Sequence, residues 1–331
     1  MSAPTATTTV PRSIPLAASV RRNAWTLGLV VFLALLLVFT KLIQPSYGAS
    51  GVQGLGSSVL PLALAAVGQA IVVISGGIDL SIGAIMALAS VVSASMMNEQ
   101  SEQFAILVVI GVLLLGVVVG AINGGLAVVT RVPDIVVTLA MSFVWAGCAL
   151  LVLKTPGGGS AQWLLDLVTG SLGNDWIPRA AVVLIVIVAV VWIPLRRSRL
   201  GLSIYAIGSN RLAAFRSGIS VGRTRIAAYM LMGLFAALGG LSLTASTGIG
   251  TPVPGPYTLM SVAAVVLGGV SLAGGRGGVF GAVVAVMILQ LIRTDITFLN
   301  INPNLAVVVQ GVILIGVVMI GSLVQIRRAR A

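Results

Sequence analysis

Long runs of apolar residues alternate with short polar stretches along almost the whole chain. A helix needs roughly 17–25 consecutive apolar residues to cross a bilayer. The runs that reach or approach this length are 24–40, 57–74, 82–97, 104–123, 135–153, 177–195, 226–244, 259–272, 279–296 and 305–324. The third and eighth are short and flanked by glycines, which predicts broken or tilted helices. The pattern therefore predicts an all-α polytopic membrane protein with about ten transmembrane helices over residues 23–325.

One polar stretch, residues 196–225, is long and strongly basic. It holds seven of the 19 Lys and Arg residues and no acidic residue. Cytoplasmic loops of membrane proteins carry an excess of Lys and Arg, so this loop is predicted to be cytoplasmic. Within it, 206–219 predicts a short helix that begins at Ser209 or Asn210. The apolar face of this helix consists of Leu212, Ala213, Phe215 and Ile219. Such a face suits docking of another protein.

The charges predict the orientation of the chain. With the N-terminus in the cytoplasm, fifteen of the 19 basic residues fall on the cytoplasmic side. The remaining four are Lys41, Lys154, Arg179 and Arg293. Residues 1–22, rich in Ser, Thr, Pro and Ala, predict a disordered cytoplasmic tail, and 326–331 predict a second cytoplasmic tail.

The composition excludes several classes of function. Hydrophobic residues make up 58% of the chain and charged residues 8%, against roughly 45–50% and about 25% in soluble domains. The net charge of +12 suits lipid head groups beside membrane segments, and we expect no binding of nucleic acid. The single cysteine, Cys148, is predicted to be a small buried apolar residue. Because the chain has no histidine, it lacks the commonest metal ligand and general base, and we expect no metal site.

Two sequence patterns indicate how the helices are arranged. The segment 132–137 opens the fifth predicted helix, and the similar segment 302–307 opens the tenth from the opposite side of the membrane. This pattern predicts an inverted repeat that relates helices 2–5 to helices 7–10, as in many transporters. The second pattern is a row of glycines four positions apart, Gly116, Gly120 and Gly124. Small residues at this spacing let two helices pack closely.

A glycine-rich turn with one carboxylate separates the second and third apolar runs. Its notable residues are Gly76, Gly77, Asp79 and Ser81. In one interpretation Asp79 or Ser81 caps the following helix. In the other, the turn is a hinge at a gate, with Asp79 paired to an arginine of the basic loop. A second glycine-rich stretch, 268–278, lacks the pattern of a phosphate-binding loop and predicts a closely packed turn.

Neutral polar residues lie within the apolar runs, whereas charged ones are almost absent there. They include Gln69, Asn123, Thr138, Ser142, Gln290 and Gln310. Thr138, Ser142 and Trp145 lie on one stripe of the fifth helix. Together with Gln69, Asn123 and Gln310 they are candidates to line a pathway for an uncharged polyhydroxyl solute. Hydrogen bonding between helices is the competing interpretation.

Three motifs give the chain a resemblance to the permeases of bacterial ATP-binding-cassette (ABC) importers for ribose, xylose and galactosides. The first is AAVGQAIVVISGGIDLSIG at 65–83, and another is VLGGVSLAGGRGG at 266–278. Between them, the loop motif consists of Gly208, Asn210, Ala213, Ala214, Ser217, Gly218 and Ile219. In the family this loop docks the ATPase. The chain departs from the family pattern at Asp134, where an aromatic residue is usual, and at Phe215-Arg216.

The resemblance implies a fold like that of the vitamin B12 importer, a type II ABC permease in the bacterial inner membrane. It implies that the chain is not an enzyme and moves a monosaccharide or related polyol into the cytoplasm. A second permease copy or paralogue, ABC ATPase subunits carrying ATP and Mg²⁺, and a periplasmic or lipid-anchored sugar-binding protein are the implied partners. Membrane lipid surrounds the complex. The rival interpretations are an ion-coupled secondary transporter and a membrane-embedded enzyme.

Overall fold

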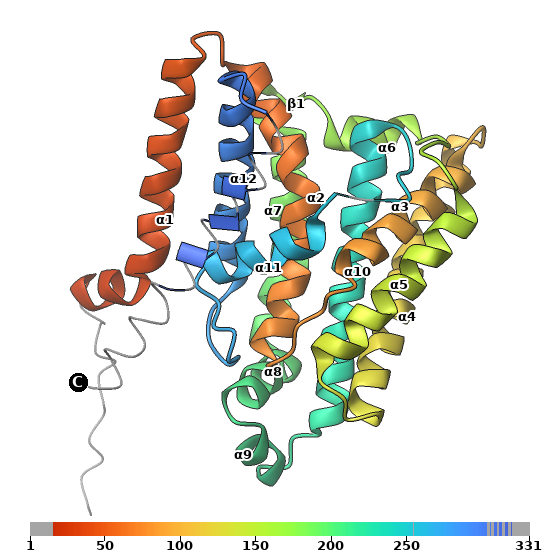
Figure 1. The fold of residues 1–331 in the computed structure, drawn as a ribbon, viewed down its shortest axis with the longest axis vertical. Coiled ribbons are helices and arrows are strands. Elements are labelled where there is room, and N and C mark those ends of the chain that lie inside the picture. Colours follow the sequence, from red (N-terminus) through yellow and green to blue (C-terminus); the bar gives the residue numbers. More distant parts are fainter. Residues whose placement is uncertain are drawn as a thin grey trace, which may run out of the picture.

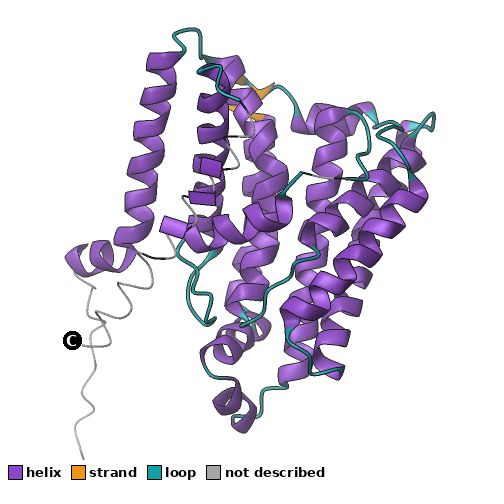
Figure 2. Ribbon diagram, viewed as in Figure 1, coloured by secondary structure: helices purple, strands orange, loops and turns teal. Residues whose placement is uncertain are grey.

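The computed structural model describes residues 16–253 and 255–302, together with scattered positions between 305 and 319. Within these residues the secondary structure consists of helices and one small hairpin, joined by loops (Figures 1 and 2). The helices are α1 (Leu16–Ile43), α2 (Ala49–Ile74), α3 (Ile82–Met97), α4 (Glu102–Val129), α5 (Asp134–Val152), α6 (Gln162–Val168), α7 (Arg179–Arg197), α8 (Arg199–Ser209), α9 (Arg211–Arg216), α10 (Val221–Thr247), α11 (Tyr257–Leu267) and α12 (Val279–Phe298). The strands are β1 (Ser171–Leu172) and β2 (Asn174–Pro178), paired antiparallel.

Among the described residues, 7 helices are long and apolar enough to cross a membrane. They are α1, α2, α4, α5, α7, α10 and α12. The third and eighth predicted helices are present as α3, with 16 residues, and α11, with 11 residues. The prediction of an all-α polytopic membrane protein is thereby confirmed. The tenth predicted helix, 305–324, lies largely outside the described residues.

The N-terminal helix is longer than its apolar run. It begins at Leu16, so residues 16–22 belong to a helix and not to the predicted disordered tail. Residues 1–15 and 326–331 lie outside the described residues. Trp25 in α1 donates from Nε1 to the carbonyl oxygen of Leu267, 2.8 Å away, and so joins α1 to the end of α11. Farther along, α1 packs against α12.

The centre of the bundle is α10, which packs against α2, α3 and α4. The α4–α10 contact depends on the predicted glycine row. A Cβ added at Gly116 would collide with the carbonyl oxygen of Gly233, and one at Gly120 with that of Tyr229. Backbones this close leave no room for side chains, and dispersion contacts between them hold the two helices together. The packing role predicted for these glycines is confirmed.

The two ends of the bundle differ. At one end, which we call the hairpin end, lie α6 and the β1–β2 hairpin; at the other, the loop end, lie α8 and α9 (Figure 1). The apolar pattern does not indicate α6, the hairpin or α8, because each of these elements is short. At α8 a local signal exists, since Ser198 accepts through Oγ from the Gly201 N–H at 3.1 Å, as a helix N-cap does.

Two long helices each lead into a non-helical segment and then a short helix. Residues 75–81 connect α2 to α3, and 248–256 connect α10 to α11. In Figure 1, α2 runs from the hairpin end to the loop end and α10 runs the opposite way. The connection after α2 turns back into the bundle, so α3 begins near its middle. Opposite directions of α2 and α10 are what the predicted inverted repeat requires, and the repeat itself stays a prediction. Most of the 302–307 segment that suggested it lies outside the described residues.

Candidate functional site

Polar side chains from two neighbouring helices hold the segment 75–81 in place. With the Gln69 amide oriented to satisfy both bonds, its Nε2 donates to the carbonyl oxygen of Asp79 at 3.0 Å and its Oε1 accepts from the Asp79 N–H at 3.3 Å. Thr138 of α5 accepts through Oγ1 from the Leu80 N–H at 3.0 Å. It also donates to the Asp134 carbonyl oxygen in its own helix, at 2.8 Å. Buried backbone groups must be hydrogen-bonded somewhere, and here side chains replace the missing helix bonds.

A chain of hydrogen bonds then links this segment to α4 and α5. Asp79 accepts through Oδ1 from both the N–H and the hydroxyl of Ser81, each at 2.6 Å. The Asn123 Nδ2 donates to the Ser81 hydroxyl at 2.7 Å. Asn123 in turn accepts through Oδ1 from the Trp145 Nε1 at 3.0 Å. Asp79, Ser81 and Asn123 are fully buried. The network therefore fixes the start of α3 relative to α4 and α5.

Most of the candidate pathway residues make hydrogen bonds within the protein. Hydrogen bonds join four of them to the segment 75–81 or to each other: Gln69, Asn123, Thr138 and Trp145. The competing interpretation of hydrogen bonding between helices predicts such bonds. Ser142 is half-buried and donates to the Leu139 carbonyl oxygen of its own helix at 2.6 Å. Gln310 lies outside the described residues.

The contacts of Asp79 differ from both interpretations, because neither Asp79 nor Ser81 makes a side-chain capping bond to α3. Asp79 stabilises the start of α3 by binding Ser81, the residue that precedes the helix. Among the residues that the structure describes, no arginine pairs with it. The loop arginine that reaches a carboxylate is Arg225, and its partner is Asp134 at the start of α5. Asp79 is fully buried and is one of the few charged residues in the interior of the described part of the chain.

The contacts of Asp79 predict the effect of removing its charge. We expect Asp79→Asn to keep uptake by the assembled transporter within about twofold of wild type, because Asn offers the same Oδ1 acceptor to the N–H and hydroxyl of Ser81. Asp79→Ala is the matched variant. It leaves the buried N–H and hydroxyl of Ser81 without their acceptor, at a cost of roughly 1–3 kcal/mol. The measurement is uptake at matched membrane levels. A large loss in Asp79→Asn would show that the charge itself is required.

Three glycine-containing segments meet at the loop end. A Cβ added at Gly208, near the end of α8, would collide with the Ile74 carbonyl oxygen at the end of α2. One at Gly274 would lie 3.0 Å from the Cα atoms of both Gly208 and Gly76. The Gly275 N–H also donates to the Ile74 carbonyl oxygen at 2.9 Å. The close packing predicted for the 268–278 turn is confirmed, and the three family-like motifs prove to be contiguous in space.

The basic loop forms two helices where one was predicted over 206–219. The first, α8, ends at Ser209, and Asn210 then begins α9 by accepting through Oδ1 from the Ala213 N–H at 2.9 Å. Gly218 ends α9 in the left-handed conformation, with φ +83°. The Ile219 N–H donates back to the Ala214 carbonyl oxygen at 3.1 Å, which completes a glycine-terminated helix end.

The exposed surface of α9 is apolar where docking was predicted. Leu212 is 58% exposed and Phe215 66%. Ala213 and Ser217 are also exposed, whereas Ala214 is buried against the rest of the chain. A groove of about 430 Å³ beside them is lined by Val128, Arg211, Leu212, Phe215, Val221 and Gly222. Large exposed apolar side chains on a basic, polar surface indicate an interaction site.

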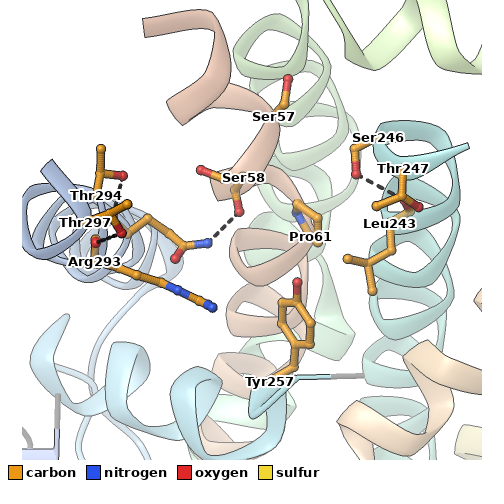
Figure 3. Close-up of a pocket in the computed structure, with 11 residues that line it drawn as sticks. Ser57, Ser58, Pro61, Leu243, Ser246, Thr247, Tyr257, Arg293, Thr294 and Thr297 are labelled. Carbon is orange, nitrogen blue, oxygen red and sulfur yellow. Dashed lines mark hydrogen bonds between the residues drawn. The ribbon is translucent and has the colours of Figure 1, made fainter. Parts of the chain in front are cut away.

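A polar pocket of about 350 Å³ opens between α2, α10, α11 and α12 (Figure 3). It is lined by Ser57, Ser58, Pro61, Leu243, Ser246, Thr247, Tyr257, Gln290, Arg293, Thr294 and Thr297. Several hydroxyls donate to carbonyl oxygens of their own helix, such as Thr294 Oγ1 to Gln290 at 3.0 Å, and keep acceptor capacity toward the pocket. The sequence analysis missed this site, because its residues come from four separate apolar runs.

The described residues contain no group of three or more Cys, Asp or Glu side chains that could hold a metal ion. The comparisons with known proteins decide the family. The model of the permease component of branched-chain amino acid transport systems matches residues 51–318. The chain belongs to this permease family.

Individual relatives agree with this assignment. The chain is 30% identical to the ribose import permease RbsC of Escherichia coli K12 over 310 residues, which cover 91% of this chain and 95% of the relative. It is 32% identical to the ribose import permease of Bacillus subtilis 168, over 89% of this chain and 92% of the relative. It is 30% identical to the D-allose transport system permease AlsC of Escherichia coli K12, over 79% and 80%. No solved structure matches the chain.

These findings confirm the resemblance to sugar-importer permeases. The chain is a multi-pass membrane protein and a permease subunit of an ABC importer. As a membrane permease component, it is not an enzyme.

Proposed function

We propose that this permease moves a monosaccharide into the cytoplasm through the bacterial inner membrane, driven by ATP hydrolysis on a separate subunit. The single observation that carries the ATP-driven part is the exposed apolar surface of α9, formed by Leu212 and Phe215. The ATPase would dock there, which places α8, α9 and both chain termini in the cytoplasm. That orientation agrees with the excess of Arg at the loop end. ATP and Mg²⁺ would be held by the partner.

The proposed substrate is an uncharged sugar or polyol. The relatives are named for ribose and D-allose, whereas the family model is named for branched-chain amino acids. The polar pocket favours the first class. Its volume of about 350 Å³ is at the lower end of ligand pockets, and its hydroxyl and amide groups, with the guanidinium of Arg293, can all hydrogen-bond a ligand that presents hydroxyls. A second permease copy or paralogue would complete the pathway, with the outer face of α5, including the half-buried Ser142, as the candidate lining.

The subunit composition of the purified complex tests the proposed partners. We expect a tagged chain, expressed with the ATPase and binding protein encoded beside it, to purify as a complex with two ATPase subunits. The binding protein, presented with D-ribose, D-allose, D-galactose, D-xylose, leucine and isoleucine, should bind a sugar and neither amino acid. Binding of leucine or isoleucine alone would contradict the proposed substrate class. Failure of any ATPase to co-purify would contradict the proposed mechanism.

An ion-coupled secondary transporter is the second candidate, and one observation favours it. Asp79 is buried in the bundle interior, and Asp295 of α12 is 4% exposed. The carboxylate oxygens of Asp295 have no hydrogen-bond partner among the described residues. Buried acids of this kind carry protons or ions in coupled carriers. The source of energy for uptake distinguishes the two functions.

A further inference from the structure

An ion pair joins two helices that are far apart in the sequence. Asp134 is the first residue of α5, and Arg225 lies in the first two turns of α10. Their side chains are only 12% and 7% exposed, and the guanidinium donates to the Asp134 Oδ1. A pair buried to this extent is held in one geometry and is little weakened by salt, unlike a surface pair.

This pair is the main direct link between α5 and α10. The backbone of α5 packs against α3 and, less closely, against α4, and it scarcely touches α10. A cavity of about 470 Å³ separates the start of α5 from the end of α8, and both Asp134 and Arg225 lie on its wall. The start of α5 is therefore linked to the loop end by a polar contact that lies beside open space. Close packing would resist movement of α5, and at this cavity it is absent.

The same pair is close in the chain to the docking surface. Helix α9 ends at Arg216, and α10 begins at Val221, so Arg225 lies nine positions after α9. The glycine end of α9 fixes the direction of the connection. A displacement of α9 thus reaches Arg225 through one short turn and the first part of a rigid helix.

The ion pair also contacts the segment 75–81. A Cβ added at Gly77 would lie 3.0 Å from the Tyr229 hydroxyl and against the Asp134 Oδ2. Tyr229 belongs to α10, so its hydroxyl faces the Asp134 carboxylate from the same helix as Arg225. The segment 75–81 consequently lies against the ion pair with no side chain between them, and α5 cannot shift at Asp134 without affecting it.

We propose that Asp134 and Arg225 are positioning residues that transmit movement of the docked α9 to α5. The inference rests on the proposed function, since it needs an ATPase on α9. When the bound ATPase moves α9, the ion pair with Arg225 moves the start of α5. This movement opens or closes the face of α5 that is proposed to line the pathway. The pair acts by position alone, and neither residue contacts the solute.

The test uses the complete complex in lipid, with spin labels at Leu35→Cys in α1 and Phe143→Cys in α5, both exposed positions, in a Cys148→Ser background. Pulsed EPR then measures the label distance in nucleotide-free and vanadate-trapped states. We expect a nucleotide-dependent shift that Asp134→Asn and Arg225→Gln each abolish. The charge-reversed double variant, Asp134→Arg with Arg225→Asp, should restore it. Arg223→Gln, which removes an exposed arginine from the same turn region, is the matched control and should leave the shift unchanged.

Transport provides the second readout. In the single variants the amount of sugar moved per ATP hydrolysed should fall on the order of tenfold, while ATPase docking is kept. Because a reversed buried pair can misfold, Arg225→Lys gives an independent comparison, since it keeps the charge and should retain most of the shift. An unchanged shift in Asp134→Asn, or equal shifts in Arg225→Lys and Arg225→Gln, would overturn the inference. If no ATPase binds wild type, the proposed function fails, and the inference fails with it.

Discussion

Replacing Gly120 by Leu is expected to prevent folding of the permease. A Cβ at this position collides with the Tyr229 carbonyl oxygen, and the Tyr229 and Met230 backbones close in on the same space. The obstruction is helix backbone, so no side-chain rotation relieves it. Overpacking that side chains can absorb costs about 1–3 kcal/mol. Here α4 and α10 must separate, so the whole contact between them is lost. The free energy of unfolding of a protein is only about 5–15 kcal/mol, and the loss of this contact can exceed it.

The measurement is the yield of monodisperse permease after extraction in mild detergent. We expect a fall of about tenfold or more for Gly120→Leu, in line with the effects of severe core changes. Gly111→Leu is the matched control. It lies on the same helix, and a Cβ there meets nothing within 4 Å. Equal yields for the two variants would contradict the close α4–α10 packing.

Replacing Phe215 by Asp should separate the permease from its ATPase while leaving the fold intact. Phe215 is 66% exposed on α9, so the change removes little internal packing. Aromatic side chains at the centre of an interface typically contribute about 2–4 kcal/mol when truncated. That corresponds to roughly 30- to 1,000-fold in Kd. The introduced carboxylate adds a desolvation cost if the surface is buried on docking.

The binding of purified ATPase to permease in nanodiscs measures this effect. Phe215→Leu is the matched variant, because it keeps an apolar side chain and should retain most of the affinity. Thermal stability of the isolated permease should be the same in all three proteins. Full ATPase binding by Phe215→Asp would show that docking occurs elsewhere on the loop end.

The features that the sequence predicted well are those encoded locally. The apolar period and length locate the membrane helices, and the glycines around 82–97 correctly mark a short helix entered through a non-helical segment. Asn210 correctly marks the start of α9, because its side chain caps the adjacent helix. The spacing of Gly116 and Gly120 likewise correctly indicates the face of their own helix that packs closely on another helix.

The features that the sequence did not predict depend on pairing across the chain. Asp134 and Arg225 are 91 positions apart, and nothing in either local sequence indicates the other. Gln69 looks the same whether its amide faces a solute or binds a backbone, and only the path of 75–81 decides between them. The polar pocket combines hydroxyls that each look like ordinary helix residues. In these cases tertiary placement gives one residue type its role.

The energy source for uptake tests the central proposal most directly. The measurement is accumulation of labelled sugar in proteoliposomes that contain the permease and its ATPase, with binding protein outside and ATP inside. The account predicts uptake that requires all three components together with ATP, stops on vanadate inhibition, and is unaffected when ionophores collapse proton and sodium gradients. Uptake driven by an ion gradient without ATP or ATPase would contradict it and assign buried Asp79 or Asp295 to an ion-coupled carrier.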